Sequence, residues 1–138
     1  AGVGGGKKLF PNQQPQNLAA ELERANKLGV KPINPSDPGF EKIANSGRIK
    51  WAVTEDGELL VIPHSSKGIE ISHATITKGK PVMAAGEADI AMFDGQAFGL
   101  DITTNSGHFL YGADAATNAA VKNIGIDAFS KFGIVFNK

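Results

Sequence analysis

Cysteine is absent from the 138 residues of this chain. That absence excludes disulfides, zinc sites built on thiolates and a cysteine nucleophile. The sequence also lacks the run of roughly 18 consecutive apolar residues that a membrane-spanning helix needs, and no secretory signal peptide is visible. We therefore expect a domain with no membrane span and no redox-dependent linkages.

A surplus of charge of either sign is also missing, because 14 basic residues balance 14 acidic ones. Such a chain has no global positive field to attract nucleic acid, so an RNA or DNA ligand would need a local basic cleft. Hydrophobic residues make up 41% of the chain and charged residues 20%. This composition and length predict one folded domain with its own core.

The first 15 residues are rich in Gly, Gln and Pro, a composition typical of a linker or disordered lead-in. The folded domain is expected over residues 16–138. "GGGKK" is not a phosphate-binding loop, because Ala1 and Lys8 stand where that motif needs Gly and Ser or Thr. The glycine-rich opening suggests a domain cut from a longer protein.

Three segments show helical patterns. In "NLAAELERANKLG", Leu and Ala at positions 18, 22, 25 and 28 form one apolar stripe. A shorter helix is predicted in "SDPGFEKIANSG", with Asp37 as its cap. The third covers Ala113–Asn123, and Gly125 is expected to end or kink it. The last apolar segment, "FGIVFN", is predicted to be a short closing strand or a packed tail.

Between residues 48 and 104 the pattern alternates with period two, which is typical of half-buried strands. The dipeptide "DG" at 56–57 and at 94–95 favours hairpin turns, and Gly86 suggests a bulge. In "IEISHATI" the alternation places His73 on a strand face among Ile and Thr. The predicted fold is α+β: N-terminal helices packed on a twisted antiparallel sheet of about five strands, with a C-terminal helix.

The chain has three histidines, at positions 64, 73 and 108. A lone histidine is most often structural, but an imidazole on an apolar face needs a partner or a cleft, which favours His73 as functional. His108 follows Asn-Ser-Gly, where small residues leave backbone amides and hydroxyls open to a ligand. Two imidazoles with pKa values near ~6.5 can act as base and acid at neutral pH. The role of His64 is left open.

A metal-free ribonuclease needs such a pair, together with a cation or hydroxyl to stabilise the charged phosphorane. The local candidates are Lys78, Lys80, Thr104, Ser106 and Tyr111, and Gly107 would let the backbone approach a phosphate. Lys67, Lys78 and Lys80 also make residues 64–80 locally basic, which would attract the phosphates of a substrate. A zinc site of three histidines is a weaker alternative, because their spacing matches no compact ligand motif. A serine hydrolase is weaker still, because Ser106 is not in a G-x-S-x-G elbow.

A resemblance to a known protein family lies in two segments, "SHATITKGKPVMAAGEADI" and "FGLDITTNSGHFLYGADAA". Their layout is a His, a strand with G-K-P-V-x-A-A-G-E, a hairpin, a strand ending in N-x-S-G-H-[FY], and a helix. This resembles the C-terminal toxin domains of bacterial polymorphic toxins, including those of contact-dependent growth inhibition systems and type VI effectors. The similarity covers roughly residues 60–125.

Many such domains look like the barnase/EndoU/colicin/RelE group of metal-independent ribonucleases. The resemblance implies that His73 and His108 form the acid/base pair, that Lys80 or Lys78 binds phosphate, and that Thr104 or Ser106 supplies the hydroxyl. It also implies cleavage of RNA, often tRNA, to a 2′,3′-cyclic phosphate without metal or cofactor. The partner would be a cognate immunity protein, with the toxin a monomer or a toxin–immunity heterodimer.

By the same resemblance, the domain would be secreted within a larger delivery protein and would act in the cytoplasm of a target bacterium. Two other functions stay open on the sequence alone. One is an NAD-consuming or ADP-ribosylating toxin, because a glycine-rich strand end with Ser, His and Tyr can also hold a nucleotide. The other is a non-enzymatic binding domain whose histidines are structural.

Overall fold

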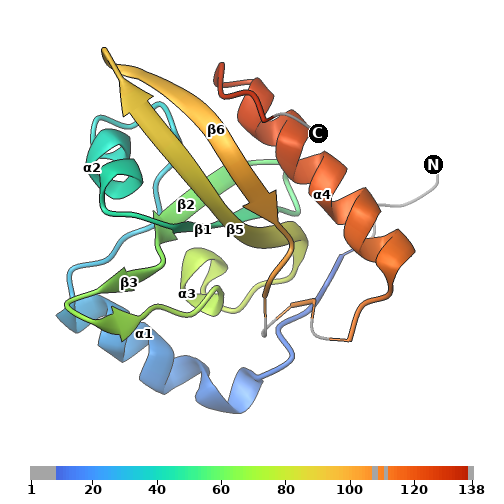
Figure 1. Ribbon diagram of the computed structural model, residues 1–138. Coiled ribbons are helices and arrows are strands. Elements are labelled where there is room, and N and C mark those ends of the chain that lie inside the picture. Colours follow the sequence, from blue (N-terminus) through green and yellow to red (C-terminus); the bar gives the residue numbers. More distant parts are fainter. Residues whose placement is uncertain (1–8, 107–108, 111, 137–138) are drawn as a thin grey trace.

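The computed structural model describes residues 9–106, 109–110 and 112–136. In chain order, and after a short 3-10 turn at Pro15–Asn17, the elements are α1 (Leu18–Lys27), α2 (Phe40–Asn45), β1 (Ile49–Thr54), β2 (Leu59–Pro63), β3 (Ser65–Ser66), β4 (Ile69–Glu70), α3 (Ala74–Thr77), β5 (Val82–Phe93), β6 (Gln96–Thr103) and α4 (Ala115–Ser130). The predicted α+β class is confirmed, with helices before an antiparallel sheet and a helix after it (Figure 1).

The main sheet has four strands in the order β2-β1-β5-β6, and each neighbouring pair of strands in it is antiparallel. β3 and β4 form a separate two-stranded sheet, so the main sheet is one strand smaller than predicted. The turn at Asp94-Gly95 is the predicted hairpin turn: both residues have positive φ, 55° and 75°, and Phe93 pairs with Gln96.

The bulge predicted near Gly86 is misplaced. The register shifts lie at Val53/Thr54 between β1 and β5, and at Asp89/Ile90 between β5 and β6. Gly86 is needed for a different reason, because a Cβ there would lie 1.8 Å from the backbone oxygen of Thr103. Gly86 thus allows the end of β6 to approach β5 closely.

The segment around His73 differs most from the prediction. The strand ends at Glu70, and His73 already has helical dihedrals (φ −56°, ψ −32°) as the residue before α3. The Ser72 hydroxyl accepts a hydrogen bond from the amide of Ala74 at 3.0 Å. Such a serine turn competes with strand pairing, so it starts the helix in place of the alternating strand.

Helix α4 is continuous through Gly125, where a break was predicted. A Cβ on Gly125 would lie 2.4 Å from Cη2 of Trp51, so this glycine lets the helix approach β1 closely. Phe129, one turn later, meets Trp51 edge-to-face with ring centroids 6.1 Å apart. Close helix–sheet packing therefore outweighs the weak helix propensity of glycine at this position.

This contact gives a stability prediction. We expect Gly125→Ala to lower the free energy of unfolding by about 2 kcal/mol, because the added methyl overlaps a buried tryptophan and overpacking costs about 1–3 kcal/mol. Asn123→Ala on the same helix is the control, since it changes an exposed residue toward higher helix propensity. Urea unfolding monitored by Trp51 fluorescence measures both. Equal stability of the two variants would contradict the packing role of Gly125.

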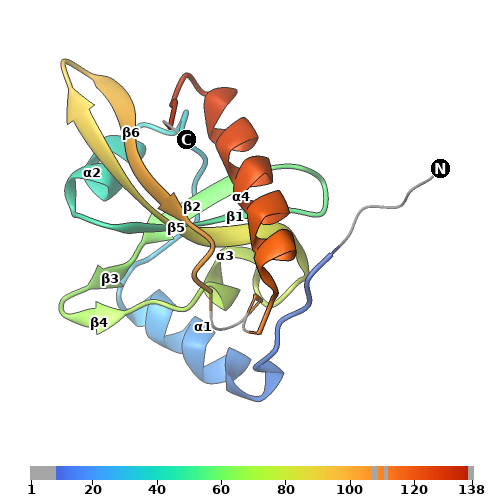
Figure 2. The same ribbon diagram turned by 45° about the vertical axis from the view of Figure 1, so that its right-hand side comes forward.

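The other face of the sheet carries the polar side chains. Successive side chains of a strand point to opposite faces, so Lys50 lies on the face opposite the α4-bound Trp51. Helices α1 and α3 and the β3–β4 hairpin lie together away from α4, and α1 packs on α3 (Figures 1 and 2). This polar face of the sheet is thus partly covered.

Both ends of the described chain contact the sheet. Phe10 exchanges two backbone hydrogen bonds with Val82, at 2.7 and 3.0 Å, so this part of the predicted lead-in belongs to the fold. At the other end the predicted closing segment forms a packed tail. The Gly99 amide donates to the Val135 carbonyl at 3.1 Å, and Phe136 is buried against Phe129.

Candidate active site

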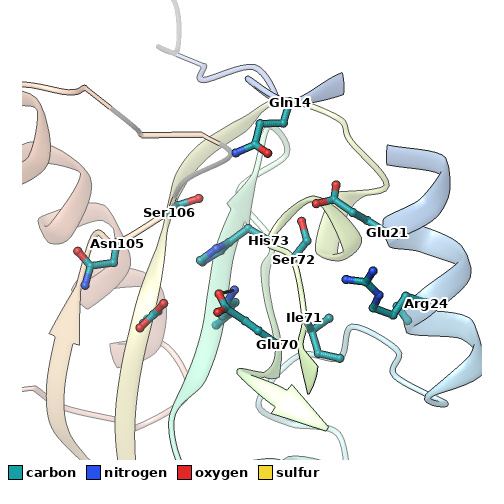
Figure 3. Close-up of a pocket in the computed structure, with 12 residues that line it drawn as sticks. Gln14, Glu21, Arg24, Glu70, Ile71, Ser72, His73, Asn105 and Ser106 are labelled. Carbon is teal, nitrogen blue, oxygen red and sulfur yellow. Dashed lines mark hydrogen bonds and ion pairs between the residues drawn. The ribbon is translucent and has the colours of Figure 1, made fainter. Parts of the chain in front are cut away.

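A cavity of about 320 Å³ lies on the polar face of the sheet. Its walls come from segments that are distant in sequence: α1, β1, the β4–α3 connection, β5 and the segment after β6 (Figure 3). Its lining residues are Gln14, Glu21, Arg24, Ala25, Lys50, Glu70, Ile71, Ser72, His73, Glu87, Asn105 and Ser106. Two of the residues singled out in the sequence, His73 and Ser106, therefore share one cavity.

His73 is 2% exposed, and its Nε2 lies 2.6 Å from the carbonyl oxygen of Gly86. A carbonyl only accepts hydrogen bonds, so Nε2 donates and carries a proton. In the neutral ring Nδ1 is then the acceptor, and in the charged ring it is a second donor. The Gly86 carbonyl thus fixes both the tautomer and the orientation of the imidazole.

Ser106 is 8% exposed, and its Oγ has no hydrogen-bond partner among the described residues. A buried hydroxyl without a partner is costly, by about 1–3 kcal/mol, and such groups are uncommon unless a ligand or water completes them. In sequence Ser106 stands two positions before His108. Asn105 and Ser106, the first two residues of "NSGH", both line the cavity.

Lys50 is the site residue that the sequence interpretation missed. Its side chain is 5% exposed, and Nζ lies 2.8 Å from Oε2 of Glu70 on β4. A single sequence does not reveal that α1 and the β3–β4 hairpin cover the strand face on which Lys50 lies. The only available signal was a lysine in the middle of the apolar strand "IKWAV".

A second charged cluster borders the cavity through Glu87. The Nε of Arg48 lies 2.8 Å from Glu87, and its Nη1 lies 2.8 Å from Asp89 and 3.5 Å from Asp101. The hydrogen bond to Glu87 and the three nearby carboxylates raise the pKa of Arg48 above its ordinary value, outweighing the opposing effect of burial. Nε2 of His64 lies 3.7 Å from Glu87. This cluster joins the residue before β1 to β5 and β6 and holds Glu87 at the cavity edge.

The predicted phosphate-binding lysines lie elsewhere. Lys78 and Lys80 are exposed and line a different hollow, together with the loop between β1 and β2. Lys67 is exposed in the β3–β4 turn and lines a third hollow beside α2. None of the three lines the cavity that holds His73. The structure places Lys50 and Arg24 there as the cationic side chains.

Thr104 is adjacent to the cavity without lining it. Its Oγ1 donates a hydrogen bond to Oδ1 of Asn118 on α4, at 3.0 Å, and it borders a shallow hollow with Asn105 and Ser106. Of the two predicted hydroxyl candidates, the structure brings only Ser106 into the cavity with His73. Thr104 instead ties the end of β6 to α4.

Three predicted residues, Gly107, His108 and Tyr111, lie outside the described residues. The pairing of His73 with His108 therefore stays a prediction. Within the described ranges, no group of three or more His, Asp or Glu side chains is arranged to hold a metal ion. In the same part of the chain, no helix is long and apolar enough to cross a membrane.

Comparison of the chain with protein families, with curated proteins and with solved structures found no match.

Proposed function

We propose that this chain is a metal-independent ribonuclease domain that acts as a toxin, and that the His73 cavity is its active site. The observation that carries the proposal is the convergence of His73, Ser106 and Lys50 on one cavity. These side chains supply a proton-transfer group, a hydrogen-bond donor and a cation, the functional groups that phosphodiester transesterification uses.

The reaction needs two proton transfers. A base takes the proton of a ribose 2′-OH, O2′ attacks the neighbouring phosphorus, and the P–O5′ bond breaks as an acid protonates O5′. We assign one transfer to His73 at Nδ1, because Nε2 donates to the Gly86 carbonyl. The other is assigned to His108. The products are a 2′,3′-cyclic phosphate and a 5′-hydroxyl, with no water consumed in this step.

Charge stabilisation is assigned to Lys50 and Ser106. A buried ammonium near the phosphorane oxygens is worth more than an exposed one, because the low local dielectric strengthens the attraction. The exposed Lys67, Lys78 and Lys80 lie outside the cavity and are assigned to neighbouring phosphates of a long RNA. In this account Lys50 takes the catalytic role that the resemblance gave to Lys80 or Lys78.

The biological setting is proposed from the resemblance. The domain would be secreted within a larger delivery protein, would cleave RNA, with tRNA the first candidate, in the cytoplasm of a target bacterium, and would be neutralised by a cognate immunity protein.

Incubation of the purified chain with total tRNA in excess EDTA, followed by a denaturing gel, tests the activity. We expect discrete RNA fragments whose yield EDTA does not change. Intact RNA together with consumption of added NAD would instead support the NAD-consuming alternative. Intact RNA and intact NAD would favour a non-enzymatic binding domain.

A further inference from the structure

The Lys50–Glu70 ion pair joins two side chains in very different environments. The Lys50 side chain is 5% exposed, whereas that of Glu70 is 64% exposed. Lys50 is fixed on the inner strand β1, between β2 and β5. Glu70 lies on the two-residue strand β4, whose only strand partner among the described residues is β3, through Ser65 and Ser66. The cation is thus held by the sheet, and the carboxylate reaches it from a small surface hairpin.

A buried ammonium needs a counter-charge, because transferring an unpaired charge out of water is strongly unfavourable. In the free protein the Glu70 carboxylate supplies it, at 2.8 Å. A phosphate group carries charge of the same sign and accepts the same hydrogen bond. Phosphate and Glu70 would therefore compete for Lys50.

Ser106 gives a second, independent indication of an anionic ligand. Its hydroxyl lines the same cavity, is more than nine-tenths buried, and is without a partner among the described residues. Figure 3 shows Ser106 and Glu70 beside His73, with Arg24 on the α1 side. A ligand oxygen that accepted a hydrogen bond from this hydroxyl and contacted Lys50 would give Ser106 a partner and Lys50 a counter-charge.

We propose that the cavity is a phosphate subsite and that Glu70 is its built-in competitor, leaving Lys50 when a phosphate group binds. The identity of that phosphate as part of an RNA rests on the proposed function, but the subsite itself does not. The competition weakens phosphate binding in the wild-type protein, so removing the Glu70 charge strengthens phosphate binding.

Glu70→Gln tests this, because it keeps the shape of the side chain and removes the charge. Glu23→Gln is the matched control: Glu23 pairs with Lys27 on the surface of α1, so the change removes the same charge and one ion pair outside the cavity. Titration with inorganic phosphate by calorimetry is the readout. We expect Glu70→Gln to bind phosphate about fivefold more tightly than wild type, the equivalent of roughly 1 kcal/mol for releasing such a pair.

We expect Glu23→Gln to bind phosphate as the wild type does, and Lys50→Met to lose binding. Equal phosphate affinities in wild type and Glu70→Gln would overturn the competition by Glu70, and no phosphate binding by either protein would overturn the subsite. The tRNA assay on the same samples separates the two proposals. Tighter phosphate binding without RNA cleavage leaves the subsite standing and the ribonuclease proposal refuted. RNA cleavage together with equal phosphate affinities in wild type and Glu70→Gln refutes only the competition by Glu70.

Discussion

His73→Gln is expected to reduce RNA cleavage by roughly 10²–10⁴-fold, the range that a positioned acid or base contributes, while the protein stays folded. Glutamine Nε2 is separated from Cα by the same number of bonds as histidine Nε2. It can therefore keep the hydrogen bond to the Gly86 carbonyl that the buried imidazole makes at 2.6 Å. The glutamine has no group that titrates near neutral pH, so only proton transfer is lost. Single-turnover cleavage of tRNA measures the rate, and circular dichroism checks the fold.

His73→Ala separates the structural role from the chemical one. The imidazole also contributes to stability, because the side chain is 2% exposed and bonded to a backbone carbonyl. Losing the packing and leaving that carbonyl unsatisfied should cost about 2–4 kcal/mol. A folded His73→Gln protein that cleaves RNA at the wild-type rate would show that His73 is structural only.

Lys50→Met is expected to lower cleavage by roughly 10²–10³-fold, as loss of a preorganised charge-stabilising donor does. Methionine fills much of the space of the lysine stem. The partner left behind, Glu70, is 64% exposed, so no buried unpaired charge remains to unfold the protein. The rate constant at saturating RNA is the informative quantity, because a group that only attracts RNA would change the affinity instead.

Lys80→Met is the matched control for Lys50→Met. Both changes remove one positive charge, but Lys80 is exposed and lines a different hollow. We expect it to weaken RNA binding slightly, most visibly at low salt, and to leave the rate at saturation unchanged. The opposite ranking, with Lys80→Met inactive and Lys50→Met active, would return the catalytic cation to the position that the resemblance suggested.

Local sequence patterns predicted most of the fold. The period-two alternation and the "DG" at 94–95 predicted the long β5–β6 hairpin, and the two positive φ values there are the reason that Asp-Gly suits it. The Leu and Ala stripe predicted α1. The prediction that Gly125 ends or kinks the helix was wrong, because this glycine is explained by a tertiary contact. It leaves room for Trp51 against the continuous helix.

The sequence predicted less of the candidate site, again because the site depends on tertiary contacts. His73 was singled out correctly as a residue that needs a partner, yet the partner, the Gly86 carbonyl, is a backbone atom that no residue pattern specifies. Lys50 was not singled out, because burial of a strand face depends on which helices cover it. The choice among Lys67, Lys78 and Lys80 relied on proximity in sequence, and all three lie in other hollows.

The chemical form of the cut RNA ends tests the central claim most directly. We expect the wild-type chain, in EDTA, to leave a 2′,3′-cyclic phosphate on one fragment of tRNA and a 5′-hydroxyl on the other, and His73→Gln and His108→Gln to leave neither. Fragments with a 3′-hydroxyl and a 5′-phosphate, or cyclic phosphate ends produced equally by folded His73→Gln, would contradict the account.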